Sequence, residues 1–368
     1  MKAILLAGGK GTRLRPLTIH TPKPIVPIFD RPFLHYQLDL LKRVPEIDEV
    51  ILSLNYQPRR IEELFGDGGD SGLSIKYVVE PAPLGTAGAV RYAGESLRES
   101  VVVFNGDVLT EVDLAAVIAL HRERKAKATI VLTPVENPSA YGLVETDAAG
   151  NIQRFLEKPK PDEITCETIN AGIYVLEPET FERIPKDMPW SIERSFFPSL
   201  IERDETFVAY VDRGYWIDIG TPEKYMQVHR DVMDGRFHAP PFAGAASPAS
   251  ITWVAPGARV EDGAILEGPC FIDDATIVKA GARIGPYSVI GRHCHIEERA
   301  VVEGSIVWAN TRISQEAVVR GSILGRHCHI GRNATIQNGV VLGDKSVITD
   351  HSRCTGMSHQ PIATSQRP

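Results

Sequence analysis

The stretch IDDATIVKAGARIGPYSVIGRHCHIEERAVV, residues 272–302, places an aliphatic residue at every sixth position. The same spacing begins at residue 254, and a small residue stands four positions after most of these aliphatic residues. A six-residue period indicates short strands that each form one side of a coil, with the aliphatic residue inside and the small one near a corner. The stretch therefore predicts a hexapeptide-repeat β-helix.

The period changes phase once and carries a repeated histidine motif. It resumes at Val318 and runs to Ile348, and we expect the break near residues 308–312 to be a loop expelled from the stack. GRHCHI occurs at 291–296 and again at 325–330. Histidines beside cysteines suggest a metal site, but Cys294 and Cys328 occupy the small inward positions. We therefore favour histidines that are solvated on the outside of the coil.

The chain before residue 235 alternates short apolar runs with amphipathic segments, which predicts an α/β domain with a mostly parallel sheet covered by helices. Such sheets bind ligands at the carboxyl ends of their strands. The predicted strands are Lys2–Ala7, Val50–Leu54, Ile75–Val79, Val101–Asn105 and Thr129–Val135. The predicted helices are Phe33–Val44, Ile61–Phe65 and Leu114–Lys125, with a hairpin over 142–156 and a last helix beginning at Thr221-Pro222-Glu223.

The boundaries that follow are a first domain over residues 1–235, a linker over 236–250, the β-helix over 251–350 and a tail over 351–368. A net charge of −7 argues against nucleic acid as a partner. No apolar run approaches the length of a membrane span. Met1 leads directly into a strand without a secretory segment, so we expect a cytoplasmic protein. The five cysteines lie far apart, which fits reduced thiols.

Residues 5–24, LLAGGKGTRLRPLTIHTPKP, put three glycines and several cations directly after the first strand. A Walker A loop fails because Gly11 follows Lys10, and a dinucleotide fingerprint fails because Leu14 replaces its third glycine. The string GGKGTRLRPLT followed by PKP resembles the signature of the sugar-1-phosphate nucleotidyltransferases. Glycine exposes backbone N–H groups to phosphate, and fixed cations bring anionic reactants together.

The resemblance implies a Rossmann-like nucleotidyltransferase domain followed by a left-handed β-helix, and it assigns roles to individual residues. Arg13 and Lys23 are the expected catalytic residues, on the departing pyrophosphate and on the α-phosphate respectively. Asp107, at the end of a predicted buried strand, and Asp218, in the segment YWIDIG, match the family's two Mg²⁺-binding aspartates. The nucleotide-binding positions that the resemblance implies are Leu6, Ala7, Gly8, Gly9, Gly11, Thr12, Arg13, Glu80, Gly85, Thr86 and Asp107.

The segment E-x-x-x-LGTAG, which begins at Glu80, resembles the guanylyltransferases of the family, and a carboxylate suits the N1–H and N2–H₂ donors of guanine. GTP is therefore the favoured nucleotide, with dTTP or UTP as the alternative. Residues that match the family's sugar-phosphate stations are Gly142, Glu157, Lys158 and Asn170.

Taken end to end, the chain is most similar to GDP-mannose pyrophosphorylases, which join GTP to mannose 1-phosphate with Mg²⁺. We expect a homo-oligomer that binds no nucleic acid and no membrane. A pyrimidine nucleotidyltransferase acting on glucose 1-phosphate is the nearest alternative. The others are a non-catalytic regulatory or scaffold subunit and an acyltransferase activity of the β-helix.

Overall fold

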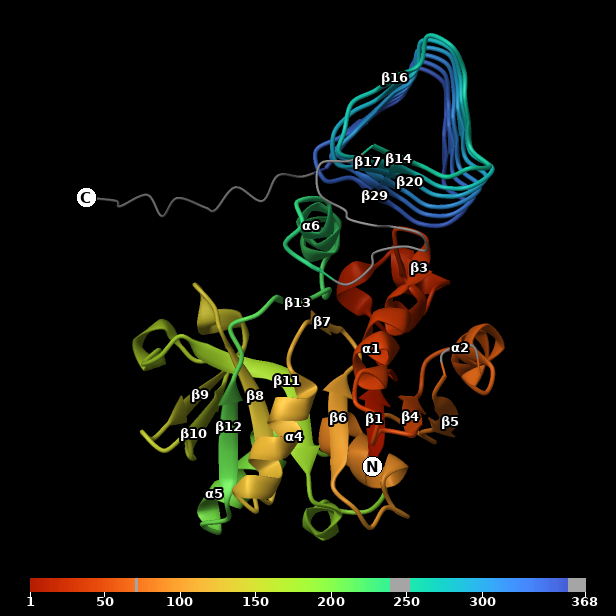
Figure 1. Ribbon diagram of the computed structural model, residues 1–368. Coiled ribbons are helices and arrows are strands. Elements are labelled where there is room, and N and C mark those ends of the chain that lie inside the picture. Colours follow the sequence, from red (N-terminus) through yellow and green to blue (C-terminus); the bar gives the residue numbers. More distant parts are fainter. Residues whose placement is uncertain (70–71, 239–251, 357–368) are drawn as a thin grey trace, which may run out of the picture. The chain divides into compact units, whose positions relative to one another are not determined.

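The structure is a computed structural model that describes residues 1–69, 72–238 and 252–356 (Figure 1). The chain forms two compact units. The first contains residues Met1–Gly11, Pro22–Val26 and Pro32–Ile219. The second contains Thr12–Thr21, Pro27–Arg31 and the described residues from Gly220 onward. The predicted linker lies largely outside the described residues.

The first unit is built on a mixed nine-stranded sheet, and the five predicted strands are present with bounds shifted by at most one residue. Its parallel part has the order β6-β1-β4-β5, formed by β1 (Lys2–Leu6), β4 (Glu49–Leu54), β5 (Ser74–Val79) and β6 (Val101–Asn105). Strand β11 (Thr168–Leu176) pairs antiparallel with β6 and joins the rest of the sheet to it. That remainder contains β8 (Ala128–Pro134), β9 (Gly142–Thr146), β10 (Ile152–Glu157) and β12 (Phe207–Val211).

Helices cover both faces of this sheet because alternate strand residues point to opposite sides. One core layer joins the sheet to α1 (Phe33–Lys42), α2 (Pro58–Phe65) and α4 (Leu114–Glu123). The other joins it to α3 (Gly85–Ala93) and α5 (Phe197–Glu202). In α1 the buried leucines Leu34, Leu38 and Leu41 recur at helical spacing, so one face of the helix meets the sheet.

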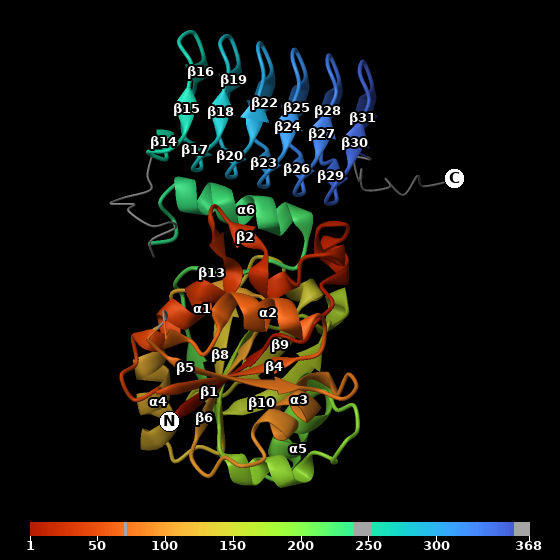
Figure 2. The ribbon, with the colours of Figure 1, turned by 90° about the vertical axis from the view of Figure 1, so that its right-hand side faces the viewer.

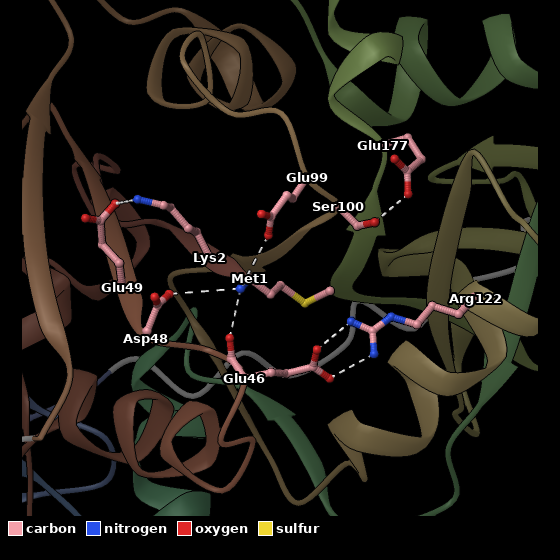
Figure 3. Close-up of polar contacts among 9 residues, drawn as sticks. All are labelled: Met1, Lys2, Glu46, Asp48, Glu49, Glu99, Ser100, Arg122 and Glu177. Carbon is pink, nitrogen blue, oxygen red and sulfur yellow. Dashed lines mark hydrogen bonds and ion pairs between the residues drawn. The ribbon is translucent and has the colours of Figure 1, made fainter.

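Polar contacts among residues near the amino ends of the strands hold that edge of the first unit together (Figure 3). Lys2 Nζ lies 2.6 Å from Glu49 Oε1, which ties β1 to β4. The Ser100 hydroxyl donates to Glu177 Oε1 over 2.5 Å, linking the residue before β6 to the residue after β11. These contacts brace the sheet at the edge opposite to the carboxyl ends of the parallel strands, where ligands of such sheets bind.

In the second unit three six-stranded parallel sheets form the three sides of the predicted β-helix. Figure 1 shows its triangular cross-section, and Figure 2 shows its coils stacked in a row. Aliphatic residues fill its interior, and Cys294 and Cys328 point inward as predicted, with burial raising the pKa of their thiols to about 12 and about 11. Small hydroxyl residues at the corners bond to the next coil. Thr276 Oγ1, for example, donates to the carbonyl of Gly291 over 2.8 Å.

The strands of the three sheets follow one another in turn along the chain. The first sheet contains β14 (Thr252–Val254), β17 (Cys270–Ile272), β20 (Ser288–Ile290), β23 (Ile306–Val307), β26 (Ile323–Leu324) and β29 (Val341–Leu342). The second contains β15 (Arg259–Val260), β18 (Ile277–Val278), β21 (His295–Ile296), β24 (Arg312–Ile313), β27 (His329–Ile330) and β30 (Val347–Ile348). The third contains β16 (Ile265–Leu266), β19 (Arg283–Ile284), β22 (Val301–Glu303), β25 (Val318–Arg320), β28 (Thr335–Gln337) and β31 (Arg353–Thr355).

The predicted loop at 308–312 is wrong, because residues 308–311 form a regular corner and Arg312 begins β24. Trp308 is buried, and its N–H donates to the carbonyl of Leu324 in the next coil over 2.9 Å. The phase changes instead at two shortened steps, from Val302 to Val307 and from Val319 to Leu324. Each step contains a glycine in the left-handed region, Gly304 with φ 54° and Gly321 with φ 53°, which lets the corner close with one residue fewer.

Two further predictions about the β-helix need correction: the inward residue of β25 and the position of the C-terminal end of the β-helix. The inward residue of β25 is Val319, whereas the sequence pattern predicted Val318. Strand β31 (Arg353–Thr355) pairs with β28, so the coil continues into residues that were predicted to be a tail.

Helix α6 (Pro222–Met233) begins as predicted, with the Thr221 side chain accepting from Lys224 N and proline in the first turn. It belongs to the same compact unit as the β-helix. The first sheet of the β-helix accordingly carries apolar residues that point outward yet are buried, namely Phe271, Val289, Ile306 and Ile323.

Candidate functional site

The carboxyl ends of β1, β4, β5 and β6 lie side by side in the sheet. The loops that follow β1 and β6 contain glycines at positions where a side chain would crowd neighbouring atoms. A Cβ at Gly106, just after β6, would lie 2.4 Å from the carbonyl oxygen of Leu6 at the end of β1. A Cβ at Gly8 would lie 3.1 Å from the N atom of Asn55 and 3.2 Å from Glu80 Oε1. The predicted residues Leu6, Gly8 and Glu80 are therefore neighbours at one edge.

Lys23 and Asp107 form an ion pair at this edge, with Lys23 Nζ 2.8 Å from Asp107 Oδ2. The lysine side chain is 10% exposed and the aspartate 30%. A short 3₁₀ turn, Lys23–Ile25, begins at Lys23 directly after Pro22, which fixes the backbone where the ammonium leaves it. The pair couples one predicted catalytic residue to one predicted metal ligand.

The second aspartate, Asp218, reaches the same edge through a two-stranded antiparallel ribbon. Strand β13 (Trp216–Asp218) pairs with β7 (Val108–Thr110), and Asp218 lies opposite Val108. The N–H of Ile219 also donates to the carbonyl of Asp107 over 3.0 Å. Asp218 is 9% exposed and accepts a long contact of 3.4 Å from the Tyr141 hydroxyl. Backbone pairing thus places the residues Asp107 and Asp218 on neighbouring segments of the chain.

Gln37 of α1 fixes the turn that carries Asp107. Its Nε2 group donates to the carbonyls of Asn105 and Val108, both over 2.9 Å, on either side of the aspartate. The side chain is 2% exposed. Nothing in the sequence singled out this glutamine, because one polar residue in an amphipathic helix has no local signature.

Glu80 is buried, and both of its carboxylate oxygens already accept hydrogen bonds within the protein. Ser53 donates to Oε1 over 3.1 Å and the Leu84 N–H donates to Oε2 over 3.0 Å. Each oxygen keeps a further lone pair. The carboxylate is thus held in one orientation and can still accept from a ligand.

The predicted residues Gly85 and Thr86 open helix α3, where the chain meets a segment that begins at Trp190. Gly85 has φ 68°, and a Cβ there would lie 2.7 Å from the carbonyl oxygen of Trp190. The Thr86 hydroxyl donates to Glu193 Oε2 over 3.1 Å and accepts from the N–H of Ile192. Glu193 lies in a π-helical turn, Ile192–Phe196, and was not identified from the sequence.

Asn170, on β11, is positioned by two hydrogen bonds. Its Oδ1 accepts from the N–H of Gly172 and its Nδ2 donates to the Tyr174 hydroxyl, both over 2.9 Å. Tyr174 is fully buried, and desolvation, followed by the nearby charge of Glu193, raises its pKa well above the usual value. One Asn170 amide proton therefore stays available for another acceptor.

Glu157, Lys158 and Gly142 come together where β10 and β9 pair. Glu157 lies opposite Gly142, and a Cβ at Gly142 would lie 3.0 Å from Glu157 Oε2. Burial, and secondly the charge of Glu193, raises the pKa of Glu157, while Lys158 and Arg194 lower it. Lys158 is exposed with φ 54°, and its N–H donates to the carbonyl of Tyr141. Strand β11, which carries Asn170, pairs with β9 as well, so the four predicted sugar-phosphate residues lie on neighbouring strands or at their ends.

Arg13 belongs to the second compact unit, in a 3₁₀ turn over Thr12–Leu14. Within that unit its guanidinium lies against Gly220, because a Cβ there would be 2.8 Å from Arg13 Nη2. Gly220 follows Asp218 by two residues. Of the glycine loop, Gly11 has φ 59°, and a Cβ at Gly9 would meet no atom within 4 Å. Ala7 continues β1 and donates its N–H to the carbonyl of Ser53.

The histidines of the two GRHCHI motifs are exposed to solvent. His293, His295, His327 and His329 are exposed, as the solvated interpretation predicted. No group of three or more histidine, cysteine, aspartate or glutamate side chains is arranged to hold a metal among the described residues. A divalent ion at Asp107 and Asp218 would accordingly complete its shell with phosphate and water oxygens, as Mg²⁺ commonly does.

Comparison with known proteins covers nearly the whole chain. A family profile described as Nucleotidyl transferase matches residues 2–235, and one described as GMPPB C-terminal domain matches residues 254–365. The chain is 41% identical to the mannose-1-phosphate guanylyltransferase of Mycobacterium tuberculosis over 77% of this chain and 76% of that protein. It is 34% identical to the UTP--glucose-1-phosphate uridylyltransferase of Synechocystis over 86% of this chain and 85% of that protein.

Solved structures resemble about three fifths of the chain. HddC from Yersinia pseudotuberculosis, complexed with GMP-PN, is 30% identical, with a TM-score of 0.53 over 61% of this chain and 96% of that chain. A putative glucose-1-phosphate thymidylyltransferase from Bacillus anthracis is 24% identical with a TM-score of 0.57, which supports the fold alone.

Among the described residues, no helix is both long and apolar enough to cross a membrane.

Proposed function

The chain belongs to the nucleotidyl transferase family, and from that premise we propose that it is a mannose-1-phosphate guanylyltransferase. It would join GTP to mannose 1-phosphate, giving GDP-mannose and pyrophosphate. The observation that carries the proposal is the ion pair of Lys23 with Asp107, at the edge where β13 brings in Asp218 opposite Val108. The similarity to a mannose-1-phosphate guanylyltransferase over three quarters of both chains supports the substrate pair.

In the proposed reaction an oxygen of the sugar phosphate attacks the α-phosphorus of GTP. The bond between that phosphorus and the α–β bridging oxygen breaks, and pyrophosphate leaves with the electron pair. Such a transfer needs positioning and charge stabilisation rather than a covalent intermediate. Lys23 is suited to hold the α-phosphate, and Arg13 to neutralise charge on the departing pyrophosphate.

Members of this family generally use a divalent metal, and the carboxylate pair fits a hard cation such as Mg²⁺. Asp107 and Asp218 would hold it, and it would supply charge neutralisation for the phosphates. Lys23 then has two partners in turn, the Asp107 carboxylate before binding and a phosphate oxygen afterwards. The existing ion pair keeps the lysine oriented until the substrate arrives.

Glu80 is the proposed selector of guanine. Its carboxylate, fixed by Ser53 and Leu84, has lone pairs left for the N1–H and N2–H₂ groups of the base. Glu157, Lys158 and Asn170 are the proposed contacts of the sugar phosphate. A pyrimidine nucleotide with glucose 1-phosphate is the second candidate, favoured by the similarity to the Synechocystis uridylyltransferase.

A substrate matrix tests the proposal. Pyrophosphate release is measured for GTP, UTP, dTTP and ATP, each with mannose 1-phosphate and with glucose 1-phosphate, in the presence of Mg²⁺. We expect the highest kcat/KM for GTP with mannose 1-phosphate, and no release by Asp218→Asn. The highest value for UTP or dTTP with glucose 1-phosphate would replace the proposal with the second candidate. No release in any combination would support a non-catalytic subunit.

A further inference from the structure

The segment between the two predicted catalytic cations belongs to the β-helix unit. Residues Thr12–Thr21 group with α6 and the β-helix, while Lys23 lies in the first unit. Pro16 follows Arg13 by three residues, and Thr21 precedes Lys23 by two. Whatever holds Pro16 and Thr21 therefore restrains the chain segment that joins Arg13 to Lys23.

One corner of the β-helix makes these contacts from successive coils. Arg326 Nη1 donates to Thr21 Oγ1 over 2.5 Å, and Thr21 is fully buried. In the next coil, a Cβ at Gly343 would lie 3.0 Å from the Cβ atom of Pro16, so the coil backbone touches the proline.

Arg326 is itself held in place from the preceding coil. Its guanidinium carbon lies 4.8 Å from the centroid of the Trp308 ring, within the range of a cation–π interaction. Trp308 Nε1 donates to the Tyr225 hydroxyl of α6 over 2.9 Å, and that hydroxyl donates to the carbonyl of Pro27. An arginine on a buried aromatic ring, bonded to a buried hydroxyl, has little rotational freedom. The contact is therefore suited to fix a backbone segment.

We propose that Arg326 is a positioning residue for nucleotidyl transfer, acting through Thr21 on the segment that joins Arg13 to Lys23. The inference rests on the proposed function, because it assigns that segment to the reaction. It gives the β-helix a role in positioning Arg13, which belongs to the same compact unit. Small displacements of reacting groups lower rates by up to about a hundredfold. We expect loss of this contact to lower kcat by roughly ten- to a hundredfold on the same basis.

The test is a double-mutant cycle in the full chain with Arg326→Ala and Thr21→Val. The matched control is Arg299→Ala, which removes an arginine that pairs with Glu316 elsewhere on the β-helix. Each single variant should lower kcat at least tenfold, with the KM for mannose 1-phosphate within about threefold of the wild type. The double variant should be no slower than either single variant, because both remove one interaction. Arg326→Lys, which keeps a donor, should recover part of kcat.

Hydrogen exchange without substrates provides a readout that does not depend on turnover. Amides of residues 12–21 should exchange faster in Arg326→Ala than in the wild type, while the amides of β6 exchange at the wild-type rate. In the control variant Arg299→Ala, the amides of residues 12–21 should also exchange at the wild-type rate. A wild type that releases no pyrophosphate from GTP and mannose 1-phosphate would contradict the proposed function and leave this exchange measurement interpretable. Unchanged exchange, normal kcat in a folded Arg326→Ala protein, or additive effects in the cycle would each overturn the inference.

Discussion

Replacing Lys23 with methionine should strengthen metal binding in the absence of nucleotide while it lowers turnover. Lys23 Nζ lies 2.8 Å from Asp107 Oδ2, so a divalent ion at Asp107 must displace the ammonium or tolerate its repulsion. Methionine has a similar length without the charge. The change therefore removes a competitor for the carboxylate and, at the same time, the group proposed to hold the α-phosphate.

The magnitude follows from the geometry and burial of the pair. Two unit charges at that separation attract by about 6 kcal/mol at an effective dielectric constant of about 20. Desolvation of a lysine that is 10% exposed cancels much of this attraction, and we take roughly 1–3 kcal/mol as the net value. Since 1.4 kcal/mol corresponds to a tenfold change in Kd, this net value corresponds to metal binding that is about 5- to 150-fold tighter in Lys23→Met.

The assay is a Mn²⁺ titration followed by electron paramagnetic resonance, with Mn²⁺ as a probe for the Mg²⁺ site and no nucleotide present. Lys2→Met is the matched control, because Lys2 pairs with Glu49 near the amino ends of β1 and β4. The control should bind Mn²⁺ like the wild type. Equal or weaker Mn²⁺ binding in Lys23→Met would show that Lys23 does not compete with the metal for Asp107, and normal turnover would show that it does not hold the α-phosphate.

Three further changes probe other parts of the molecule. Arg13→Ala should lower kcat on the order of a thousandfold, by analogy with arginines that stabilise phosphoryl transfer, and near-normal turnover of the folded variant would argue against its role. Glu80→Gln should lower kcat/KM for GTP about tenfold or more and shift a GTP–dTTP competition toward dTTP, because the amide donor of glutamine would face the N–H donors of guanine. An unchanged ratio of GTP to dTTP products would show that Glu80 does not select guanine. Burial and, secondly, the charge of Asp273 raise the pKa of Asp30 to about 6. Between about pH 4 and 6 the native state therefore binds more protons than the unfolded state, and the free energy of unfolding falls as the pH rises. Asp30→Asn should therefore gain roughly 2–3 kcal/mol over the wild type across that window in urea unfolding at several pH values, and a constant difference would contradict the shift.

The β-helix could be predicted from sequence because each coil buries the same positions, so that packing repeats as a period. The prediction failed where the period shortens by one residue, at Gly304 and Gly321. A glycine is common in sequence, and only its left-handed φ shows that the corner has closed early. The predicted expulsion of residues 308–312 followed from assigning that change to the wrong corner.

The candidate site was predictable where a local motif ends a strand, as at Asp107. The arrangement around it depends on contacts distant in sequence, such as Gln37 bridging two carbonyls and Glu193 receiving Thr86. Neither residue lies in a recognisable pattern. The assignment of Thr12–Thr21 to the β-helix unit is likewise a property of tertiary packing, because the string around it is continuous with the first strand.

The most direct measurement of the central claim is a single reaction that contains equal concentrations of GTP, UTP and dTTP with mannose 1-phosphate and Mg²⁺. Mass spectrometry of the products then reports nucleotide choice under competition. We expect GDP-mannose as the dominant product, with pyrophosphate released in equal amount. Predominant UDP- or dTDP-mannose, or nucleotide sugar formed without pyrophosphate, would contradict it.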